Sequence, residues 1–326
     1  MLSTLENMPF GPDSVYEFTG KGFLFVDDGK LRYKDIYDEG KDYAVELSSP
    51  NVALAGSSSI TAVYNDTAMQ IVGAEFPIEF SGRVLEVRCG SGYAAVLKQD
   101  DQKSYSLQVF DKSGSQVDQI TFNDSSPMDF GFYGSDSEIL WTISIETSGS
   151  EPTSTITTYD MSKSATTGVI NIQSHLIERP MYSGKSLFVS TTNNLLRFDP
   201  VQNNESWRLK TYGWRLTDCF PSERPCFMLV PRNAAALSTV KLYSVDEKEM
   251  ANETETIVHL PINTLGAYLC SNKLIAVTPA EILTYSFDGR AGESYPLDMI
   301  IEKAAKVDDS HIMLQSSGRL YIVTVK

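Results

Sequence analysis

The segment Met128–Ile172, MDFGFYGSDSEILWTISIETSGSEPTSTITTYDMSKSATTGVINI, sets the pattern of the chain. It contains four short apolar runs, each rich in β-branched and aromatic residues and bounded by Gly, Ser, Asp or Pro: Met128–Tyr133, Ile139–Ile145, Ser154–Tyr159 and Gly168–Ile172. Runs of this kind predict consecutive short strands joined by turns. Four antiparallel strands in about 45 residues match the size of one blade of a β-propeller.

The rest of the chain repeats this unit. Each repeat has an apolar run, a turn, and a second run that ends at or near Tyr or Phe. The eight apolar runs are GFLFV (22–26), ITAVY (60–64), GYAAVL (92–97), EILWTISI (138–145), KSLFVS (185–190), CFMLV (226–230), KLIAVT (273–278) and HIMLQ (311–315). Their mean spacing of about 41 residues lies within the range of propeller repeats. The predicted fold class is therefore all-β, a β-propeller of four-stranded antiparallel blades, with eight blades favoured and seven the alternative.

No linker or shift in composition divides the chain, so we expect residues 1–326 to form a single propeller domain. The last repeat has room for only three strands, and a strand from the N-terminus would remove the open edge. Leu2–Pro9 is the expected donor, and Ser14–Thr19 is the alternative that leaves seven blades possible. Two segments fit the strand pattern poorly: Val245–Glu255 is charged and predicts a long surface loop, whereas Met299–Val307 has helical propensity but occupies the position of a first strand.

The charge of the chain restricts its partners. There are 27 Lys and Arg against 42 Asp and Glu, a formal net charge of −15. Such a surface repels phosphate backbones and anionic membranes, so no nucleic-acid partner is expected. No apolar run is long enough to cross a bilayer, so no transmembrane segment is predicted in this chain. The N-terminus lacks the features of a signal peptide. Either the protein is cytoplasmic, or an export signal or anchor lies outside this sequence.

No catalytic motif stands out. The nucleophile elbow, the zincin motif, the P-loop and the dinucleotide fingerprint are all missing from the sequence. The acidic pairs lie in turn-like contexts, where Asp favours turns through its own side-chain hydrogen bonds. We therefore predict no catalytic, cofactor-binding or metal-binding residues. The groups considered were the histidines His175, His259 and His311 and the pairs Asp27-Asp28, Asp100-Asp101 and Asp308-Asp309.

Aromatic residues give the stronger functional hint. The segment WRLKTYGWR (207–215) mixes aromatic and basic residues in an otherwise acidic chain, and exposed aromatics often anchor partners. Packing between blades is the competing interpretation, and it is the one favoured for aromatic residues in general. The candidate partner-binding residues are Trp207, Arg208, Lys210, Tyr212, Trp214 and Arg215. A second aromatic cluster is formed by Tyr33, Tyr37 and Tyr43.

The cysteines do not fix the redox environment. Cys89 and Cys270 lie in or beside apolar runs, which indicates small core residues. Cys219 and Cys226 flank a short turn in CFPSERPC, so a hairpin disulfide between them is a candidate if the geometry allows it. No second Cys or His pair has the spacing of a zinc site.

The chain also resembles known propellers. Paired strands that end in VFD (109–111), TYD (158–160) and RFD (197–199) are similar to quinoprotein-type and outer-membrane assembly-lipoprotein-type propellers. From FPIEFSGRVLEVRCGSGYAAVL (76–97) to SLFVSTTNNLLRFD (186–199), the chain resembles an uncharacterised Firmicutes family. Members of that family have a short cytoplasmic tail, one transmembrane anchor and an extracytoplasmic propeller. The resemblance implies this fold and an extracytoplasmic location, with the anchor missing from the sequence given.

The expected function follows from fold and surface. We expect a non-catalytic, extracytoplasmic protein-interaction or envelope-assembly scaffold that needs no cofactor, because propellers present loops on a rigid frame. The alternatives are a glycan-active hydrolase with paired carboxylates and a carbohydrate-binding lectin that uses its aromatics. The partner would accordingly be a protein, or a glycan under the alternatives. The side chains that line the central funnel of the propeller would discriminate between these classes.

Overall fold

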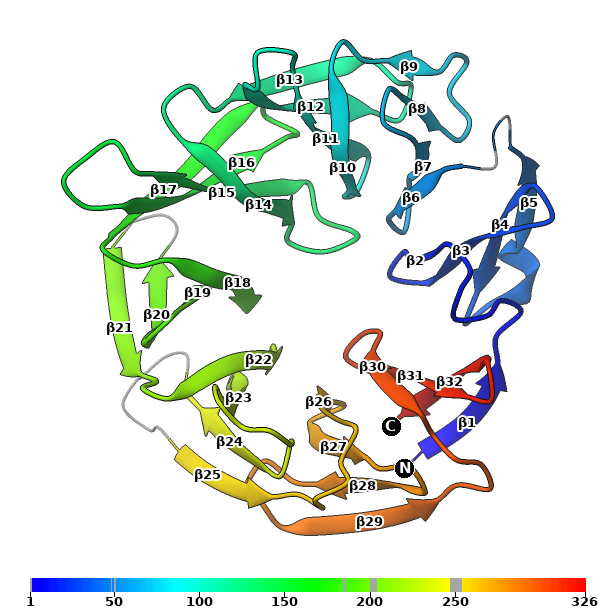
Figure 1. Ribbon diagram of the computed structural model, residues 1–326, viewed down its shortest axis with the longest axis vertical. Coiled ribbons are helices and arrows are strands. Elements are labelled where there is room, and N and C mark those ends of the chain that lie inside the picture. Colours follow the sequence, from blue (N-terminus) through cyan, green and yellow to red (C-terminus); the bar gives the residue numbers. More distant parts are fainter. Residues whose placement is uncertain (1, 48, 50, 184–185, 200–203, 247–253) are drawn as a thin grey trace. The chain divides into compact units, whose positions relative to one another are not determined.

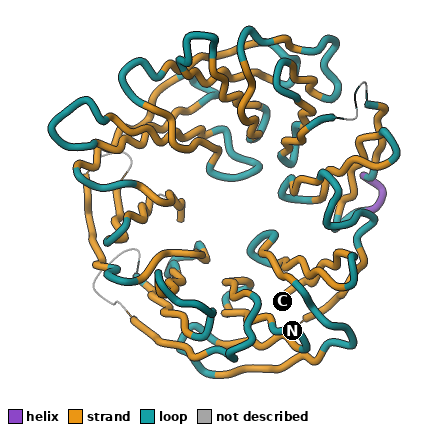
Figure 2. Tube along the Cα trace, viewed as in Figure 1, coloured by secondary structure: helices purple, strands orange, loops and turns teal. Residues whose placement is uncertain are grey.

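The computed structural model describes residues 2–47, 49, 51–183, 186–199, 204–246 and 254–326. Within these residues the chain is all-β, with eight four-stranded antiparallel sheets and one 3-10 helix, η1 (Glu39–Lys41) (Figures 1 and 2). This is the fold of an eight-bladed β-propeller, as the sequence predicts. The eight sheets exclude the seven-bladed alternative.

The sheets divide equally between two compact units. Unit 2 spans residues 14–176 and holds the first four sheets. In chain order its strands are β2 (Tyr16–Phe18), β3 (Gly22–Asp27), β4 (Lys30–Asp35) and β5 (Tyr43–Glu46); β6 (Ala53–Gly56), β7 (Thr61–Tyr64), β8 (Ala68–Ile71) and β9 (Ile78–Glu79); β10 (Arg83–Cys89), β11 (Tyr93–Gln99), β12 (Tyr105–Asp111) and β13 (Gln116–Thr121); and β14 (Ser126–Phe132), β15 (Ile139–Glu146), β16 (Thr153–Asp160) and β17 (Ala165–Gln173).

Unit 1 combines the N-terminal segment 1–13 with residues 177–199 and 204–326. Its strands are β18 (Ile177–Ser183), β19 (Ser186–Thr191), β20 (Asn194–Asp199) and β21 (Asn204–Lys210); β22 (Trp214–Phe220), β23 (Cys226–Pro231), β24 (Thr239–Ser244) and β25 (Thr254–His259); β26 (Gly266–Cys270), β27 (Lys273–Val277), β28 (Glu281–Tyr285) and β29 (Ala291–Pro296); and β30 (Lys303–Lys306), β31 (His311–Ser316), β32 (Arg319–Val325) and β1 (Leu2–Asn7). The prediction of a single domain over residues 1–326 stays a prediction.

The N-terminal strand completes the last sheet, as expected. β1 pairs antiparallel with β32, and Leu5 lies opposite Val323. Leu2 packs against the apolar cluster that this sheet shares with the preceding one. The alternative donor is wrong, because residues 16–18 form the first strand of the first sheet. The chain therefore enters unit 1, builds unit 2, and returns to unit 1.

All eight apolar runs of the sequence are second strands of their sheets. The second strand lies inside its sheet, hydrogen-bonded to a strand on each side, and its apolar run is continuous. In β15 the consecutive residues Leu140–Ile143 are all buried. The fourth strand has a free edge and shows alternation instead: in β17 buried and exposed residues alternate from Gly168 to Gln173.

Side chains between neighbouring sheets form the core. In unit 1, Met228 and Leu242 of one sheet pack against Leu269 and Leu274 of the next. Each of these side chains is at most 1% exposed. Burial of apolar surface stabilises the folded state by about 25 cal/mol per Å². Contacts of this kind are therefore the main contribution to the stability of the fold. First strands of consecutive sheets also contact one another, as β22, β26 and β30 do in unit 1.

Tight turns connect the strands where the sequence places them. Asp28 and Gly29 join β3 to β4 with φ angles of 48° and 72°. Two consecutive positive φ angles define the hairpin turn whose twist matches that of the flanking strands. Ser317 and Gly318 have the same angles, 48° and 72°, between β31 and β32.

The two poorly patterned segments have different outcomes. Met299–Val307 contains β30, the first strand of its sheet, as its position predicts. Of the loop predicted at Val245–Glu255, residues 247–253 lie outside the described residues. The loop prediction is wrong for the end of this segment, because Thr254 and Glu255 begin β25 and pair with β24.

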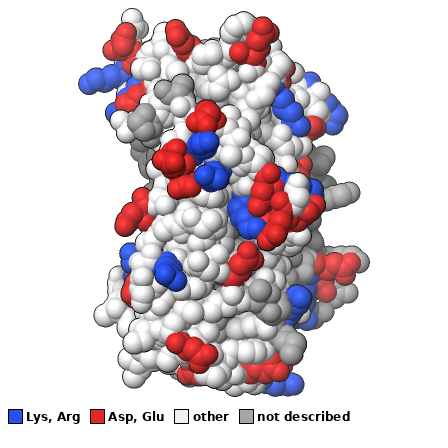
Figure 3. Space-filling model, turned by 90° about the vertical axis from the view of Figure 1, so that its right-hand side faces the viewer, with Lys and Arg blue, Asp and Glu red and all other residues white. Residues whose placement is uncertain are grey.

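On the face of the molecule shown in Figure 3, acidic and basic side chains lie in small mixed groups separated by uncharged areas.

Candidate functional site

The segment 207–215 connects two sheets of unit 1. It contains the end of β21, the turn 211–213 and the start of β22. Trp207 is turned toward the core: its ring centroid lies 6.5 Å from that of Phe188 and 6.1 Å from that of Tyr243. Trp207 is therefore a packing residue between sheets, which is the competing interpretation of the sequence pattern.

The other residues of the segment have different surroundings. Arg208 is paired with Glu205, with 2.6 Å between Nη2 and Oε2, and this bond raises its pKa. Tyr212 is 65% exposed at the turn. The Trp214 ring lies 4.8 Å from the Nζ atom of Lys241, a cation–π contact.

Two cavities lie beside this segment on unit 1. Lys210, Tyr212 and Trp214 line the smaller one, of about 130 Å³. Arg215 lines the larger one, of about 300 Å³. The segment thus divides into one half-buried tryptophan that packs between sheets, one internally paired arginine and two groups at separate cavities.

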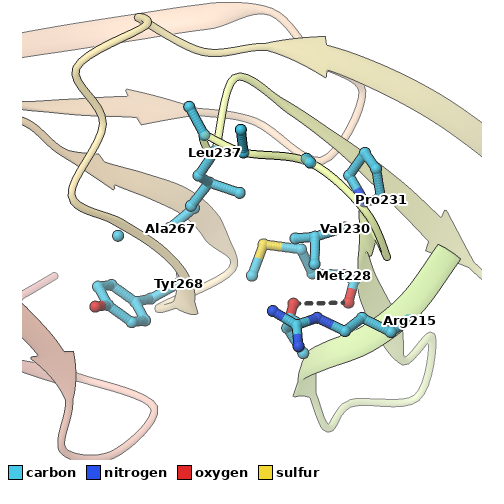
Figure 4. A pocket seen from close by; sticks show the side chains of 12 residues that line it. Arg215, Met228, Val230, Pro231, Leu237, Ala267 and Tyr268 are labelled. Atoms are coloured by element: carbon cyan, nitrogen blue, oxygen red, sulfur yellow. Dashed lines mark hydrogen bonds between the residues drawn. The ribbon is translucent and has the colours of Figure 1, made fainter.

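The Arg215 cavity is formed by β22, β23, the loop that follows β23, and β26. Its wall is mostly apolar and small (Figure 4). The lining residues are Arg215, Thr217, Met228, Val230, Pro231, Ala234, Ala235, Ala236, Leu237, Gly266, Ala267 and Tyr268. Short alanine side chains in the loop leave the space open, where longer ones would fill it.

Local structure fixes the wall of the cavity. Thr217 donates a hydrogen bond of 3.2 Å to the Met228 carbonyl, which ties β22 to β23. Gly266 begins β26, and a Cβ built there would lie 2.2 Å from the Tyr268 hydroxyl oxygen. Only glycine at that position lets the Tyr268 ring lie across the strand and face the cavity opposite Met228 (Figure 4).

The charged group of the cavity is the Arg215 guanidinium. Arg215 is exposed, and its side chain makes no hydrogen bond or ion pair with any residue that the structure describes. A neighbouring arginine, Arg179, is engaged already, because it donates a bond of 2.6 Å to the Thr217 carbonyl. Tyr268 donates a bond of 2.6 Å to the Ala304 carbonyl, and burial raises its pKa to about 12. The cavity therefore presents one free cation beside a neutral, apolar wall.

Next to the cavity, one carboxylate joins three sheets. Asp218 of β22 lies 3.0 Å from the Lys306 Nζ atom of β30 and accepts a bond of 2.8 Å from the Leu269 backbone N–H of β26. Lys306 also pairs with Asp309 at 2.8 Å. Burial alone would lower the pKa of Lys306, but the two aspartates outweigh it and raise that pKa. These ion pairs and hydrogen bonds hold the three sheets together.

A comparable network occurs in unit 2. Arg88 of β10 pairs with Glu86 at 2.7 Å and with Asp129 of β14 at 2.8 Å. It also donates to the Phe130 carbonyl and stacks over that ring at 5.0 Å. Burial raises the pKa of Glu17 on β2, and the nearby Arg88 opposes the shift. The carboxylates Glu86 of β10 and Asp129 of β14 therefore pair with one cation, Arg88, and this joins the two sheets.

The disulfide prediction disagrees with the strand register. Cys226 pairs with Phe220, and Cys219 pairs with Phe227, so the two cysteines point to opposite faces of the sheet. Cys226 accordingly belongs to one apolar cluster and Cys219 packs against another. Both are free thiols, and burial raises both pKa values, that of Cys226 to about 12.

The remaining candidates are dispersed. His311 is bonded to Asp308 at 2.9 Å, while His259 ends β25 and His175 lies after β17. Among the residues that the structure describes, no group of three His, Cys, Asp or Glu side chains is arranged to hold a metal ion. No helix in the described part of the chain is long and apolar enough to cross a membrane.

Sequence reasoning missed most of the Arg215 cavity. Its wall comes from a loop (231–237) and from a strand more than fifty residues after Arg215, and single-residue patterns do not reveal such proximity. The available signal was the run NAAALS (233–238), in which small residues follow a buried strand.

Comparison with known proteins shows the fold and no more. No protein-family model matches the chain, and a search of curated proteins finds no sequence relative. Among solved structures, BamB from Moraxella catarrhalis has a TM-score of 0.58 at 11% identity, over 99% of this chain and 98% of that one. The WD40 domain of SCAP from fission yeast has a TM-score of 0.61 at 10% identity, over 98% of each chain.

An enzyme has the same fold. An oligogalacturonate lyase in complex with manganese has a TM-score of 0.55 at 11% identity, over 100% of this chain and 96% of that one. A WD40 domain and a lyase therefore share the architecture, so the fold alone does not separate a binding module from an enzyme. The resemblance to the Firmicutes family stays a prediction. This chain is similar in structure to β-propeller proteins of several kinds.

Proposed function

We propose that the chain is a non-catalytic binding module that holds a partner protein at the Arg215 cavity. The observation that carries the proposal is an open apolar cavity of about 300 Å³ with an unengaged guanidinium at its edge. Buried anchor side chains that fill such cavities supply most of the affinity of protein interfaces. The segment of the partner would place one large apolar side chain in the cavity and a carboxylate on Arg215.

The charge pattern supports a carboxylate as the second contact. Arginine offers a planar fork that pairs with both oxygens of a carboxylate. The net charge of −15 does not prevent this, because fields are screened beyond roughly 8 Å at physiological salt. Within that distance the carboxylate would meet the Arg215 guanidinium at the edge of the cavity.

The chemistry of the lining favours binding over catalysis. Of the twelve lining residues, the only titratable ones are Arg215 and Tyr268. The Tyr268 hydroxyl is bonded to a backbone carbonyl, and its raised pKa keeps it neutral at physiological pH. Neither group is arranged as a nucleophile or a general base, whereas both suit the recognition of an amphipathic segment.

Capture of partners from the source organism tests the proposal. We would immobilise the wild-type chain, Arg215→Glu and Ala235→Trp, which places a large ring at the rim of the cavity, and expose them to a detergent-solubilised envelope extract. Arg319→Glu is the matched control, because Arg319 is also exposed in unit 1 and has no described partner. The proposal expects the same proteins on wild type and Arg319→Glu, and their loss from the other two. Equal capture by all four would refute it.

The location is a separate proposal. We propose that the protein works outside the cytoplasm, a location implied by its resemblance to anchored extracytoplasmic propellers. Its support is the resemblance of residues 76–199, described above. Protease accessibility on intact cells of the source organism tests it: an extracytoplasmic protein is digested without lysis, and a cytoplasmic one is not.

A further inference from the structure

A second cavity lies in unit 2, on its first three sheets. Its volume is about 450 Å³, within the range of small-ligand sites. The lining residues are Lys21, Tyr33, Asp35, Lys41, Tyr43, Ser57, Ser58, Ser59, Ile60, Thr61, Ile71, Val72 and Lys112. In contrast to the Arg215 cavity, this one is polar and contains three lysines.

The cavity is formed by turns that lie on one side of unit 2. Lys21 lies in the β2–β3 turn, Ser57–Ser59 in the β6–β7 turn, Lys41 in η1 between β4 and β5, and Lys112 in the β12–β13 turn. In antiparallel sheets the first-to-second and third-to-fourth turns lie at the same end of the strands. Four separate chain segments therefore bring their polar side chains to the same place.

Hydrogen bonds between these turns make the cavity wall rigid. The Ser57 hydroxyl donates a bond of 2.7 Å to the Gly90 carbonyl in the next sheet. Ser58 donates a bond of 3.4 Å to the Ser135 carbonyl, two sheets away. Gly20 has a φ angle of +92°, and a Cβ built there would lie 2.1 Å from the Ser135 hydroxyl oxygen. The turn that carries Lys21 thus packs closely against the same loop.

The lysines are available to an anion. Lys21 and Lys112 are exposed, and neither side chain makes a hydrogen bond or ion pair with another described residue. Lys41 has a long ion pair, 3.4 Å, with Asp38. The cavity therefore has a local excess of positive charge in a chain with a net charge of −15.

The one carboxylate of the lining, set against three lysines, is engaged within the protein. Asp35 is only 3% exposed. Its Oδ1 atom accepts bonds from the backbone N–H groups of Tyr37 and Asp38, at 2.8 and 2.9 Å. Its Oδ2 atom accepts the Tyr33 hydroxyl at 3.2 Å. Asp35 therefore holds the β4–η1 turn, and its oxygens are occupied.

An aromatic pair forms another part of the lining. The rings of Tyr33 and Tyr43 stack with centroids 5.2 Å apart and planes at 19°. Tyr43 is 38% exposed, and its hydroxyl lies 3.0 Å from the Thr61 hydroxyl. Burial raises the pKa of Tyr33 to about 12, so its hydroxyl stays neutral. The third tyrosine of the sequence cluster, Tyr37, is exposed and does not line the cavity.

We propose that this cavity binds an anionic saccharide, a sugar ring that carries a carboxylate or a phosphate. A sugar ring has an apolar C–H face that packs on aromatic rings, and hydroxyls that bond to serine and threonine. The acidic substituent pairs with Lys21 and Lys112. Cations, hydroxyls and an aromatic surface in one cavity match these three features together. A lone inorganic anion would use only the lysines and would leave most of the volume unfilled.

Calorimetric titration of the full chain tests the proposal. The probes are a glucuronate-containing disaccharide, glucose 6-phosphate, cellobiose as the uncharged sugar, and inorganic phosphate as the anion without a ring. We expect at least one of the two acidic sugars to bind about tenfold or more tightly than cellobiose and phosphate. The two acidic probes distinguish a carboxylate from a phosphate as the natural substituent.

Variants locate the binding. Lys21→Gln/Lys112→Gln removes the two free cations, and Lys273→Gln/Lys303→Gln removes the same charge from unit 1. The first pair should weaken binding of the acidic sugar by about tenfold and reduce its salt dependence, while the second pair leaves both unchanged. Lys21, Lys112 and Lys303 are exposed, whereas Lys273 is half-buried and donates to the Lys326 carbonyl at 3.1 Å, so melting curves are needed to confirm that both variants are folded. Equal affinity for all four probes, or equal loss in both variants, would overturn the proposal.

Discussion

At the scale of single residues, Asp218 shows how much one polar group can organise. Its two carboxylate oxygens reach Lys306 on one neighbouring strand and the Leu269 N–H on another. The side chain of Asp218 is 9% exposed and that of Lys306 is 19% exposed, so water screens the pair weakly. Removing one partner would leave the other charge buried and uncompensated.

We predict that Lys306→Met lowers the free energy of unfolding by about 3 kcal/mol, the usual cost of breaking a buried ion pair. Urea unfolding followed by tryptophan fluorescence measures the change. Lys30→Met is the control, because the Lys30–Glu46 pair is exposed and is worth less than about 1 kcal/mol. Similar losses of unfolding free energy in both variants would show that the Asp218–Lys306 pair does not hold the sheets together.

Asp308 gives a prediction of pH dependence. Burial would raise its pKa, but hydrogen bonds from His311 and the Ser310 N–H outweigh burial and lower it. A carboxyl whose pKa is lower in the folded state stabilises the protein fully above its unfolded pKa of about 4. That contribution is lost as the pH falls through the lowered folded value.

Asp308→Asn should therefore reduce the loss of stability between pH 5 and pH 2, measured as the shift in the urea midpoint at about those values. Asp298→Asn, on an exposed carboxylate of the same unit, is the comparison. If the two variants follow the same pH profile, the His311–Asp308 bond contributes nothing to acid sensitivity.

At the scale of elements, the last sheet depends on the N-terminal strand. β1 covers the hydrogen-bonding edge of β32, and Leu2 adds to the apolar cluster of that sheet. An uncovered strand edge is a template for pairing with another chain. The position of β1 in unit 1, far from residues 177–326 in sequence, makes this sheet discontinuous.

Deletion of residues 1–7 should lower the melting temperature and cause concentration-dependent association, because the edge of β32 becomes free. Size-exclusion chromatography over a range of concentrations measures the association. A synthetic peptide of residues 1–13, added in excess, should restore the monomer and raise the melting temperature. A deletion variant that stays monomeric with an unchanged melting temperature would show that β1 is dispensable.

Strands were predictable from the sequence because their signal is local. A second strand covered on both faces needs a continuous apolar run, and each run is visible without knowledge of its neighbours. The cavities were not predictable in this way. Arg215 and Tyr268 line one cavity, and Lys21 and Lys112 line another, only because separate turns and strands come together in three dimensions. Trp207 and Trp214 look alike in sequence, and both pack at the edge of one apolar cluster, yet only Trp214 also lines a small cavity.

At the scale of the whole molecule, charge and fold limit the function without defining it. Solved propellers include a WD40 domain and a lyase, so architecture supplies a frame and the loops supply the chemistry. The chain has a net charge of −15, and on the face shown in Figure 3 acidic and basic side chains lie in small mixed groups. A cation such as Arg215 therefore acts locally.

We predict that the chain does not bind double-stranded DNA even at about 50 mM salt, where electrostatic attraction to phosphates is strong. A gel-shift titration measures this. Binding that weakens with added salt would show a basic surface that outweighs the net charge, and would contradict the exclusion of nucleic acid.

The most direct test of the central claim is a charge swap between Arg215 and the partner. Once a partner is captured, its affinity is measured for the wild type, for Arg215→Glu, and for Arg215→Glu combined with a partner variant in which the contacting carboxylate residue is replaced by Lys. The account predicts a loss of about tenfold or more with Arg215→Glu and recovery of most of it in the swapped pair. Unchanged affinity in Arg215→Glu, or a loss that the swap does not recover, would contradict a binding module centred on the Arg215 cavity.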